Sequence, residues 1–135
     1  HSFGTLICFE VIFPELFRQF VAEGAGFMTT ITNDAWFGRS AAPEQHFSMV
    51  VFRAVENRTP VARAANTGIS GFIDSRGRVL KTSGLFEPSW LIEELEYYGE
   101  KTVYTRFGDL FGWANLVLTF LMLTTPLLLK RKKND

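Results

Sequence analysis

A run of 20 residues without a charged side chain, from Leu110 to Leu129, constrains this chain more than any other feature of its sequence. As an α-helix it would measure about 30 Å, which is the thickness of the hydrocarbon layer of a membrane. Trp113, a residue type typical of membrane interfaces, lies near the start of the run. A long buried helix of a soluble protein is the alternative. We expect a transmembrane helix over residues 110–129.

The charges outside this run are unevenly distributed. The tail at residues 130–135 holds four of the 14 basic residues, and the rest of the chain has 10 basic and 13 acidic residues. Basic residues beside a membrane span favour the cytoplasmic side, so we expect a cytoplasmic tail and a periplasmic body over residues 1–109. The mildly acidic body makes a nucleic-acid partner a poor expectation.

The periodicity of the body predicts strands and helices in alternation, followed by a meander of strands. Pro14 is expected to open a helix that ends at Gly24, and a second helix is expected from Pro43 to about Asn57. This order predicts an α/β fold with mixed sheets. The predicted strands cover residues 4–9, 26–32, 61–65, 69–74 and 78–82, with weaker candidates at 91–97 and 102–105.

The start of the chain and its single cysteine carry two further expectations. An apolar run begins almost at once after His1, without an initiator Met, and we expect the chain to be the C-terminal part of a longer protein. One cysteine excludes an internal disulfide framework and a CxxC-type metal site. The sequence suggests no metal and no organic cofactor.

Cys8 is the candidate nucleophile, because it ends an apolar strand a few residues before a helix. Such a turn displays a side chain, and the N–H group of Phe9 would lie beside the sulfur and stabilise an oxyanion. Glu10 is close enough in sequence to orient a substrate or another catalytic group. An inert core cysteine is the alternative. His46 is predicted to be a polar residue on a helix surface, with no specific link to Cys8.

Several short segments, in the same order along the chain, are together similar to one family. They resemble the nitrilase-type domain of the bacterial apolipoprotein N-acyltransferases, and they extend over most of residues 4–80. The segments are Ile7-Cys8-Phe9-Glu10, Phe13-Pro14, Thr32-Asn33-Asp34-Ala35-Trp36-Phe37-Gly38, Ala42-Pro43-Glu44-Gln45-His46, Arg53-Ala54-Val55-Glu56 and Arg63-Ala64-Ala65-Asn66-Thr67-Gly68-Ile69-Ser70.

The resemblance implies part of a nitrilase-like α-β-β-α sandwich, followed by one C-terminal transmembrane helix. Such enzymes use a Cys-Glu-Lys triad, and Cys8 matches the nucleophile. The Glu and the Lys precede the nucleophile in this family, so this chain alone is expected to be inactive. Glu10 matches a position that supports the site, and Phe9 stands where the family usually has Tyr. Trp36 and Phe37 are expected beside the site as contacts for an acyl chain, or else as core residues that anchor a loop.

The implied activity is the last step of lipoprotein maturation at the bacterial inner membrane. A fatty acyl group would pass from a phospholipid, through a thioester on Cys8, to the N-terminal amine of a diacylglyceryl-cysteine lipoprotein. The implied partners are the phospholipid donor, the apolipoprotein acceptor and the bilayer. Two other interpretations stay open, a nitrilase-like amidase or other carbon–nitrogen hydrolase, and a non-catalytic domain that retains Cys8.

Overall fold

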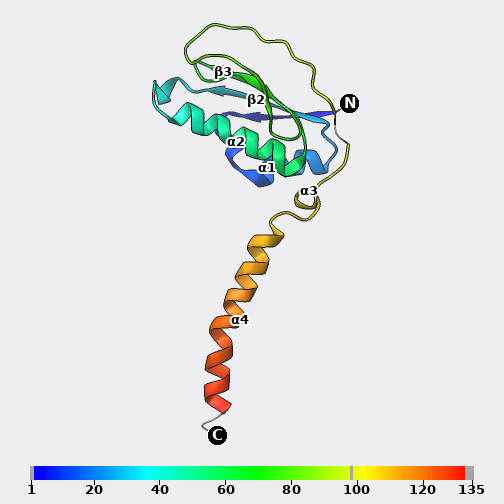
Figure 1. Cartoon of the computed structure of the whole chain (residues 1–135), viewed down its shortest axis with the longest axis vertical. Helices are drawn as coiled ribbons and strands as arrows, with labels where there is room; N and C mark the ends of the chain where they lie inside the picture. The colour runs from blue at the N-terminus through cyan, green and yellow to red at the C-terminus, as the bar shows by residue number, and fades with distance from the viewer. Residues whose placement is uncertain (1, 98, 133–135) are drawn as a thin grey trace.

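The structure, a computed structural model, describes residues 2–97 and 99–132. Its strands and helices follow the predicted alternation as far as residue 82 (Figure 1). In chain order they are β1 (Phe3–Ile7), the 3-10 helix η1 (Cys8–Ile12), α1 (Pro14–Ala22), β2 (Phe27–Asn33), the 3-10 helix η2 (Ala35–Phe37), α2 (Ala42–Asn57), β3 (Val61–Asn66), β4 (Gly71–Ile73), β5 (Val79–Thr82), α3 (Val103–Phe107) and α4 (Leu110–Lys132).

One sheet contains all five strands in the order β1-β2-β3-β4-β5. The first three strands are parallel, and β4 and β5 are added antiparallel at one side. Parallel neighbours need a crossover connection, which α1 supplies between β1 and β2, and α2 between β2 and β3. Both helices lie on the same face of the sheet (Figure 1). The predicted α/β fold with a mixed sheet is confirmed.

The two faces of this sheet differ in how far they are covered. Alternate residues such as Leu6, Met28 and Val61 point toward α1 and α2 and are buried, together with Phe17 and Val50 of the helices. The residues between them face the other way, and many stay exposed, including Phe3, Ile7 and Ile31. The described residues therefore supply one helical layer and one sheet of the expected sandwich.

The segment after β5 corrects two predictions. Residues 91–97, all of them described, form no strand, although Leu91, Glu93 and Leu95 are partly buried in alternation. This segment crosses beside the sheet instead of pairing with its edge (Figure 1). Residues 102–105 were also predicted as a strand, but Thr102 caps the short helix α3, because its hydroxyl accepts a hydrogen bond from the N–H of Thr105 at 2.9 Å.

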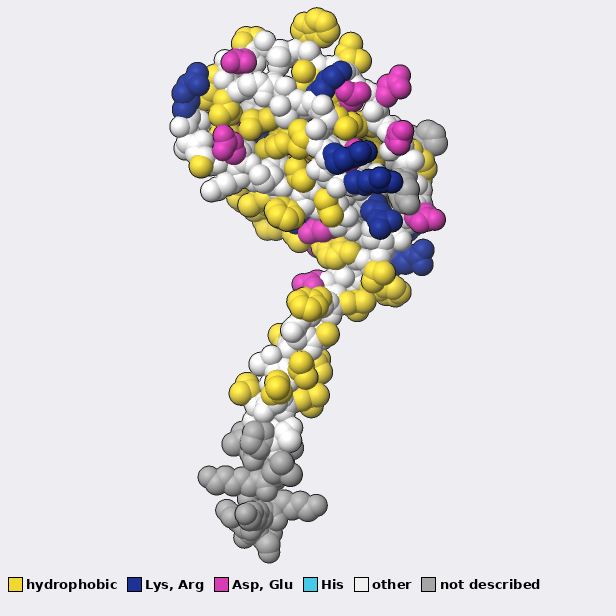
Figure 2. Space-filling model, viewed as in Figure 1, with side chains coloured by type: hydrophobic (Ala, Val, Ile, Leu, Met, Phe, Trp, Pro, Cys, Tyr) yellow, Lys and Arg dark blue, Asp and Glu magenta, His cyan; other side chains and the backbone are white. Residues whose placement is uncertain are grey.

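Helix α4 covers the segment predicted as a membrane span and projects away from the sheet (Figures 1 and 2). Its large apolar side chains up to Leu123 are at least half exposed. Among the residues described, no helix combines the length and the apolarity that a bilayer crossing requires. Residues 133–135 of the predicted basic tail lie outside the described residues.

Candidate active site

Cys8 lies where β1 ends and η1 begins, and its side chain is partly buried. Its φ angle is +54°, in the left-handed region that residues other than glycine seldom adopt. This conformation costs about 1–3 kcal/mol and persists only where the surroundings hold it. The chain therefore turns sharply at the cysteine, and the role of Cys8 as a nucleophile stays a prediction.

Glu10 is bound to the backbone of the same turn. Its carboxylate Oε2 accepts a hydrogen bond from the N–H of Ile7 at 2.7 Å, which closes a capping interaction around η1. The residue before Cys8 is thus tied to the second residue after it across this turn. In the structure Glu10 binds the backbone that carries the cysteine, and its role in catalysis stays a prediction.

The ring of Phe9 is 54% exposed and packs against two other rings. Its centroid lies 6.4 Å from that of Phe13 in an edge-on arrangement, and 6.0 Å from that of His46. Phe9 thus connects the cysteine turn to helix α2.

His46 corrects the prediction of a surface residue, because it is only 4% exposed. Its Nδ1 atom lies 3.1 Å from Oδ1 of Asp34, whose side chain is fully buried. The spacing of His46, Val50, Arg53 and Asn57 on α2 is helical, and all four are buried. That shared stripe is the sequence signal for a buried histidine. The polar side chain of histidine favoured the opposite prediction, a residue that faces solvent.

Arg63 of β3 completes a buried polar network with Asp34 and His46. Its Nη2 atom donates to Oδ2 of Asp34 at 2.8 Å and lies 3.2 Å from Nδ1 of His46, and its Nε donates to the carbonyl of Ile69 at 3.1 Å. Burial lowers the pKa of Arg63, and the charge of Asp34 opposes that shift. An arginine keeps its charge in such a setting, so Arg63 and Asp34 form a buried ion pair.

The loop that carries Trp36 and Phe37 begins at Asp34 and forms η2. Phe37 is partly buried and packs edge-on against His46, with ring centroids 6.0 Å apart. Trp36 is 75% exposed. The structure therefore brings Phe37 together with Phe9 around one histidine, while Trp36 faces solvent from the same loop.

The positions of the parallel strand ends explain why these side chains, from separate segments of the chain, lie close together. Cys8 follows β1, Asp34 follows β2, and β3 ends at Asn66, so all three lie at the carboxyl edge of the sheet. Asn66 donates a hydrogen bond to Oδ1 of Asn33 at 3.2 Å across this edge. Functional groups commonly collect at the carboxyl edge of a parallel sheet.

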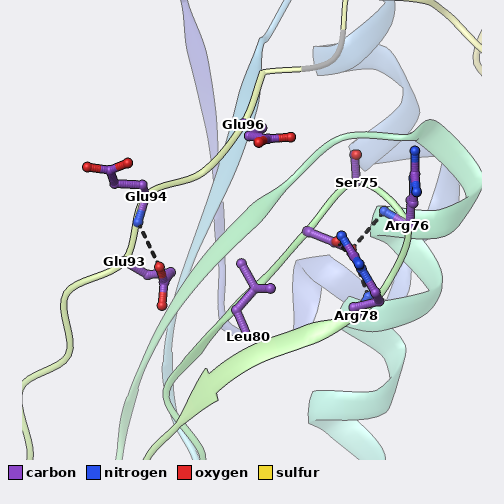
Figure 3. A pocket seen from close by; sticks show the side chains of 8 residues that line it. Ser75, Arg76, Arg78, Leu80, Glu93, Glu94 and Glu96 are labelled. Carbon is purple, nitrogen blue, oxygen red and sulfur yellow. Dashed lines mark hydrogen bonds and ion pairs between the residues drawn. The ribbon is translucent and has the colours of Figure 1, made fainter.

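The opposite edge carries a polar pocket between the β4–β5 turn and the segment after β5 (Figure 3). Asp74 organises the turn, accepting hydrogen bonds from the backbone N–H groups of Arg76 and Arg78. Because Ile73 pairs with Val61 at the start of β3, this pocket lies at the other end of the strands from Cys8. In the described part of the chain, no group of three or more His, Cys, Asp or Glu side chains is placed to hold a metal ion.

The sequence profile of the carbon-nitrogen hydrolase family matches residues 2–99. The chain therefore belongs to the carbon-nitrogen hydrolase family.

Within this family, the chain is similar to apolipoprotein N-acyltransferases. It is 55% identical over 111 residues to the apolipoprotein N-acyltransferase of Geobacter metallireducens, a match that covers 82% of this chain and 21% of that protein. The Haemophilus influenzae enzyme of the same name is 37% identical over 133 residues, covering 98% of this chain and 26% of that protein. The chain thus spans about a fifth to a quarter of the length of these relatives. The resemblance read from the sequence is confirmed.

Solved structures agree with the fold. A carbon-nitrogen hydrolase from Helicobacter pylori G27 superposes with a TM-score of 0.56 at 15% identity, over 64% of this chain and 37% of that one. An amidase of the nitrilase superfamily from Nesterenkonia AN1 gives a TM-score of 0.52 at 27% identity, over 63% of this chain and 34% of that one.

Proposed function

We propose that this chain is the catalytic-cysteine portion of an apolipoprotein N-acyltransferase. The observation that carries the proposal is the 55% identity to such an enzyme over 111 residues. The family profile over residues 2–99 includes Cys8, the cysteine in the sharp strand-to-helix turn. The proposed activity transfers a fatty acyl group from a phospholipid to the N-terminal amine of a diacylglyceryl-cysteine lipoprotein.

The first half-reaction would form a thioester on Cys8. The thiolate attacks the ester carbonyl of the phospholipid, the C–S bond forms, and the C–O bond to the glycerol oxygen breaks. That oxygen takes up a proton and leaves as the lysophospholipid. The backbone N–H of Phe9 is the proposed donor to the oxyanion, and Glu10 holds the turn through Ile7.

The second half-reaction would release the acyl group to an amine. The neutral amine of the lipoprotein attacks the thioester carbonyl, the C–N bond forms, and the C–S bond breaks to return the Cys8 thiol. Proton transfer in both steps is assigned to a Glu and a Lys outside this chain, so the 135 residues alone would be inactive. Trp36 and Phe37 are the proposed contacts for the acyl chain, because aromatic surface beside the site, most of it exposed at Trp36, suits an apolar ligand.

We also propose that α4 is a membrane anchor, with the body, residues 1–109, on the periplasmic side and the basic tail, 130–135, in the cytoplasm. Residues 110–129 carry no charge, and the described apolar side chains of α4 stand largely exposed. A thiol introduced at Ser75, with Cys8 replaced by Ala, tests the orientation. It is expected to react with a membrane-impermeant reagent in intact spheroplasts, and labelling from the cytoplasmic side alone would contradict the proposal.

The experiment on the chemistry uses the full-length protein in vesicles with a phospholipid labelled in its acyl chain. Mass spectrometry is expected to find an acyl adduct on the Cys8 peptide that neutral hydroxylamine removes, and Cys8→Ala is expected to lack it. Addition of a diacylglyceryl peptide with a free amine should discharge the adduct. A folded protein that forms no adduct with intact donor would contradict the proposal.

A carbon–nitrogen hydrolase activity is the second candidate, supported by the superposition on the Nesterenkonia amidase. In that case water would replace the amine as the acceptor. Release of a carboxylic acid from a simple amide, with no discharge of an acyl adduct to the diacylglyceryl peptide, would favour this alternative.

A further inference from the structure

Two separate segments proposed to meet the acyl group share one buried side chain. His46 packs against Phe9, the residue after Cys8, and against Phe37 in the loop after β2, with both ring centroids 6.0 Å away. The histidine therefore lies between the cysteine turn and the aromatic loop.

The orientation of this ring is set by the buried ion pair behind it. Asp34 receives hydrogen bonds from Arg63 and from the hydroxyl of Thr32, which leaves its carboxylate little freedom to move. Nδ1 of His46 lies 3.1 Å from that carboxylate. Gly68 packs so closely on Asp34 that an added Cβ would overlap the carboxylate. Four segments of the carboxyl edge therefore meet at one charged group.

A histidine at this buried position carries a cost in free energy. Its Nε2 atom is buried and has no hydrogen-bond partner among the described residues, and the same is true of Nη1 of Arg63. Burying a polar atom without a partner is unfavourable, and an apolar side chain of similar volume would avoid that cost. What the imidazole adds is the Nδ1 contact, which fixes the ring plane against Phe9 and Phe37.

We propose that His46, oriented by Asp34 and Arg63, is a positioning residue that holds the Cys8 turn and the Trp36–Phe37 loop in register for acyl transfer. The left-handed backbone at Cys8 needs such support from inside, because Glu10 braces it only from the exposed side. This role rests on the proposed function, since the acyl group defines what must be aligned.

The test separates the two nitrogen atoms of the ring in the full-length protein. An asparagine amide nitrogen reaches the position of Nδ1, whereas a glutamine amide reaches that of Nε2. His46→Asn is expected to form the Cys8 thioester within about tenfold of the wild-type rate, which is the scale of one adjusted hydrogen bond. His46→Gln and His46→Leu are expected to slow it by about 100-fold, the scale of a misplacement near 1 Å, with a smaller change in KM.

A matched control and a second readout keep the outcomes distinct. Gln45→Ala, at an exposed position of the same helix, is expected to stay within about twofold of wild type. Amide hydrogen exchange is expected to rise in residues 8–12 and 34–38 together in His46→Gln, and to stay low in His46→Asn, with β3 unchanged. Equal behaviour of the Asn and Gln variants in exchange would overturn the positioning role. If the wild type forms no thioester while this exchange pattern holds, the proposed function fails, and only the structural coupling of the two segments through His46 stands, without a role in acyl transfer.

Discussion

Asp34 and Asp74 each follow a strand of the same sheet, at opposite edges, and each accepts a hydrogen bond from an arginine side chain. Asp34 and Arg63 are both fully buried, and their pair joins the loops around Cys8. Asp74 is mostly buried, but its partner Arg78 is 70% exposed, and their pair closes the β4–β5 turn. The same two residue types therefore form one ion pair that solvent screens, at Asp74, and one that solvent does not reach, at Asp34.

The difference teaches that burial, more than the hydrogen bonds themselves, sets what each pair does. A pair in water gains little, because solvent screens the attraction and competes for the hydrogen bonds. A pair out of water is costly to form and more costly to break, because either partner left alone is a buried charge. A substitution at the carboxyl edge of the sheet should therefore disturb the packing of several loops. A substitution at the opposite edge, near Asp74, should disturb only its own turn.

The largest expected effect is that of Arg63→Met. Removal of the guanidinium leaves the buried Asp34 carboxylate without its cation, so the free energy of unfolding should fall by about 3–5 kcal/mol. The matched change Arg78→Met should cost at most about 1 kcal/mol. Urea denaturation of both variants measures the contrast, and equal losses would break the comparison.

Gly68→Ala should have the next largest effect, at about 1–3 kcal/mol, because the new methyl group overlaps the Asp34 carboxylate in a packed interior. Gly84→Ala is the control, since its Cβ would meet only the flexible end of Glu87. Thermal unfolding of the two variants is the measurement. A Gly68→Ala protein as stable as the control would show that Asp34 can move, contrary to the rigid network described above.

Asp74→Asn should produce a smaller effect that depends on pH. Partial burial raises the pKa of Asp74, but hydrogen bonds from Arg78 and Arg76 outweigh it and hold the pKa below its ordinary value. The folded state then releases this proton more readily than the unfolded state, so the contribution is present above the unfolded pKa of about 3.9 and is lost as pH falls through the folded pKa. At neutral pH the variant should lose about 1 kcal/mol or less. A loss that persisted at pH 2 would contradict this assignment.

Salt should have the smallest effect, and only at one edge. Raising the ionic strength from about 0.1 M to 1 M shortens the screening length from about 10 Å to about 3 Å. The stability difference between wild type and Arg78→Met should shrink under these conditions, and the difference for Arg63→Met should stay nearly constant. Unfolding curves at both salt concentrations make this measurement.

The sequence predicted most of the local structure up to residue 82. The helix that starts at Pro14 and the helix that ends at Asn57 agree with the structure within a residue or two, because proline at a helix start and apolar spacing are local signals. The prediction was wrong at residues 91–97, where alternation was present but the segment pairs with none of the five strands. A strand requires a neighbour, and no local pattern states where that neighbour lies.

The sequence likewise predicted one part of the candidate site and missed another. Cys8, Glu10 and Phe37 were identified as candidates from a strand-to-helix transition and a family resemblance, both of which depend on residues near one another in the chain. His46 was misassigned and the Asp34–Arg63 pair was not anticipated, because their side chains come from three elements that only the sheet order brings together.

What the sequence determined by itself was the alternation of elements, the turn at Cys8 and the uncharged run at its end, since each depends on residues near one another in the chain. The tertiary structure alone decided that an aspartate, a histidine and an arginine, separated by up to 29 positions, share one dry site behind the cysteine. The physical reason is that burial is a property of the packed fold. The same carboxylate–guanidinium chemistry is a screened surface pair at Asp74 and an unscreened one at Asp34.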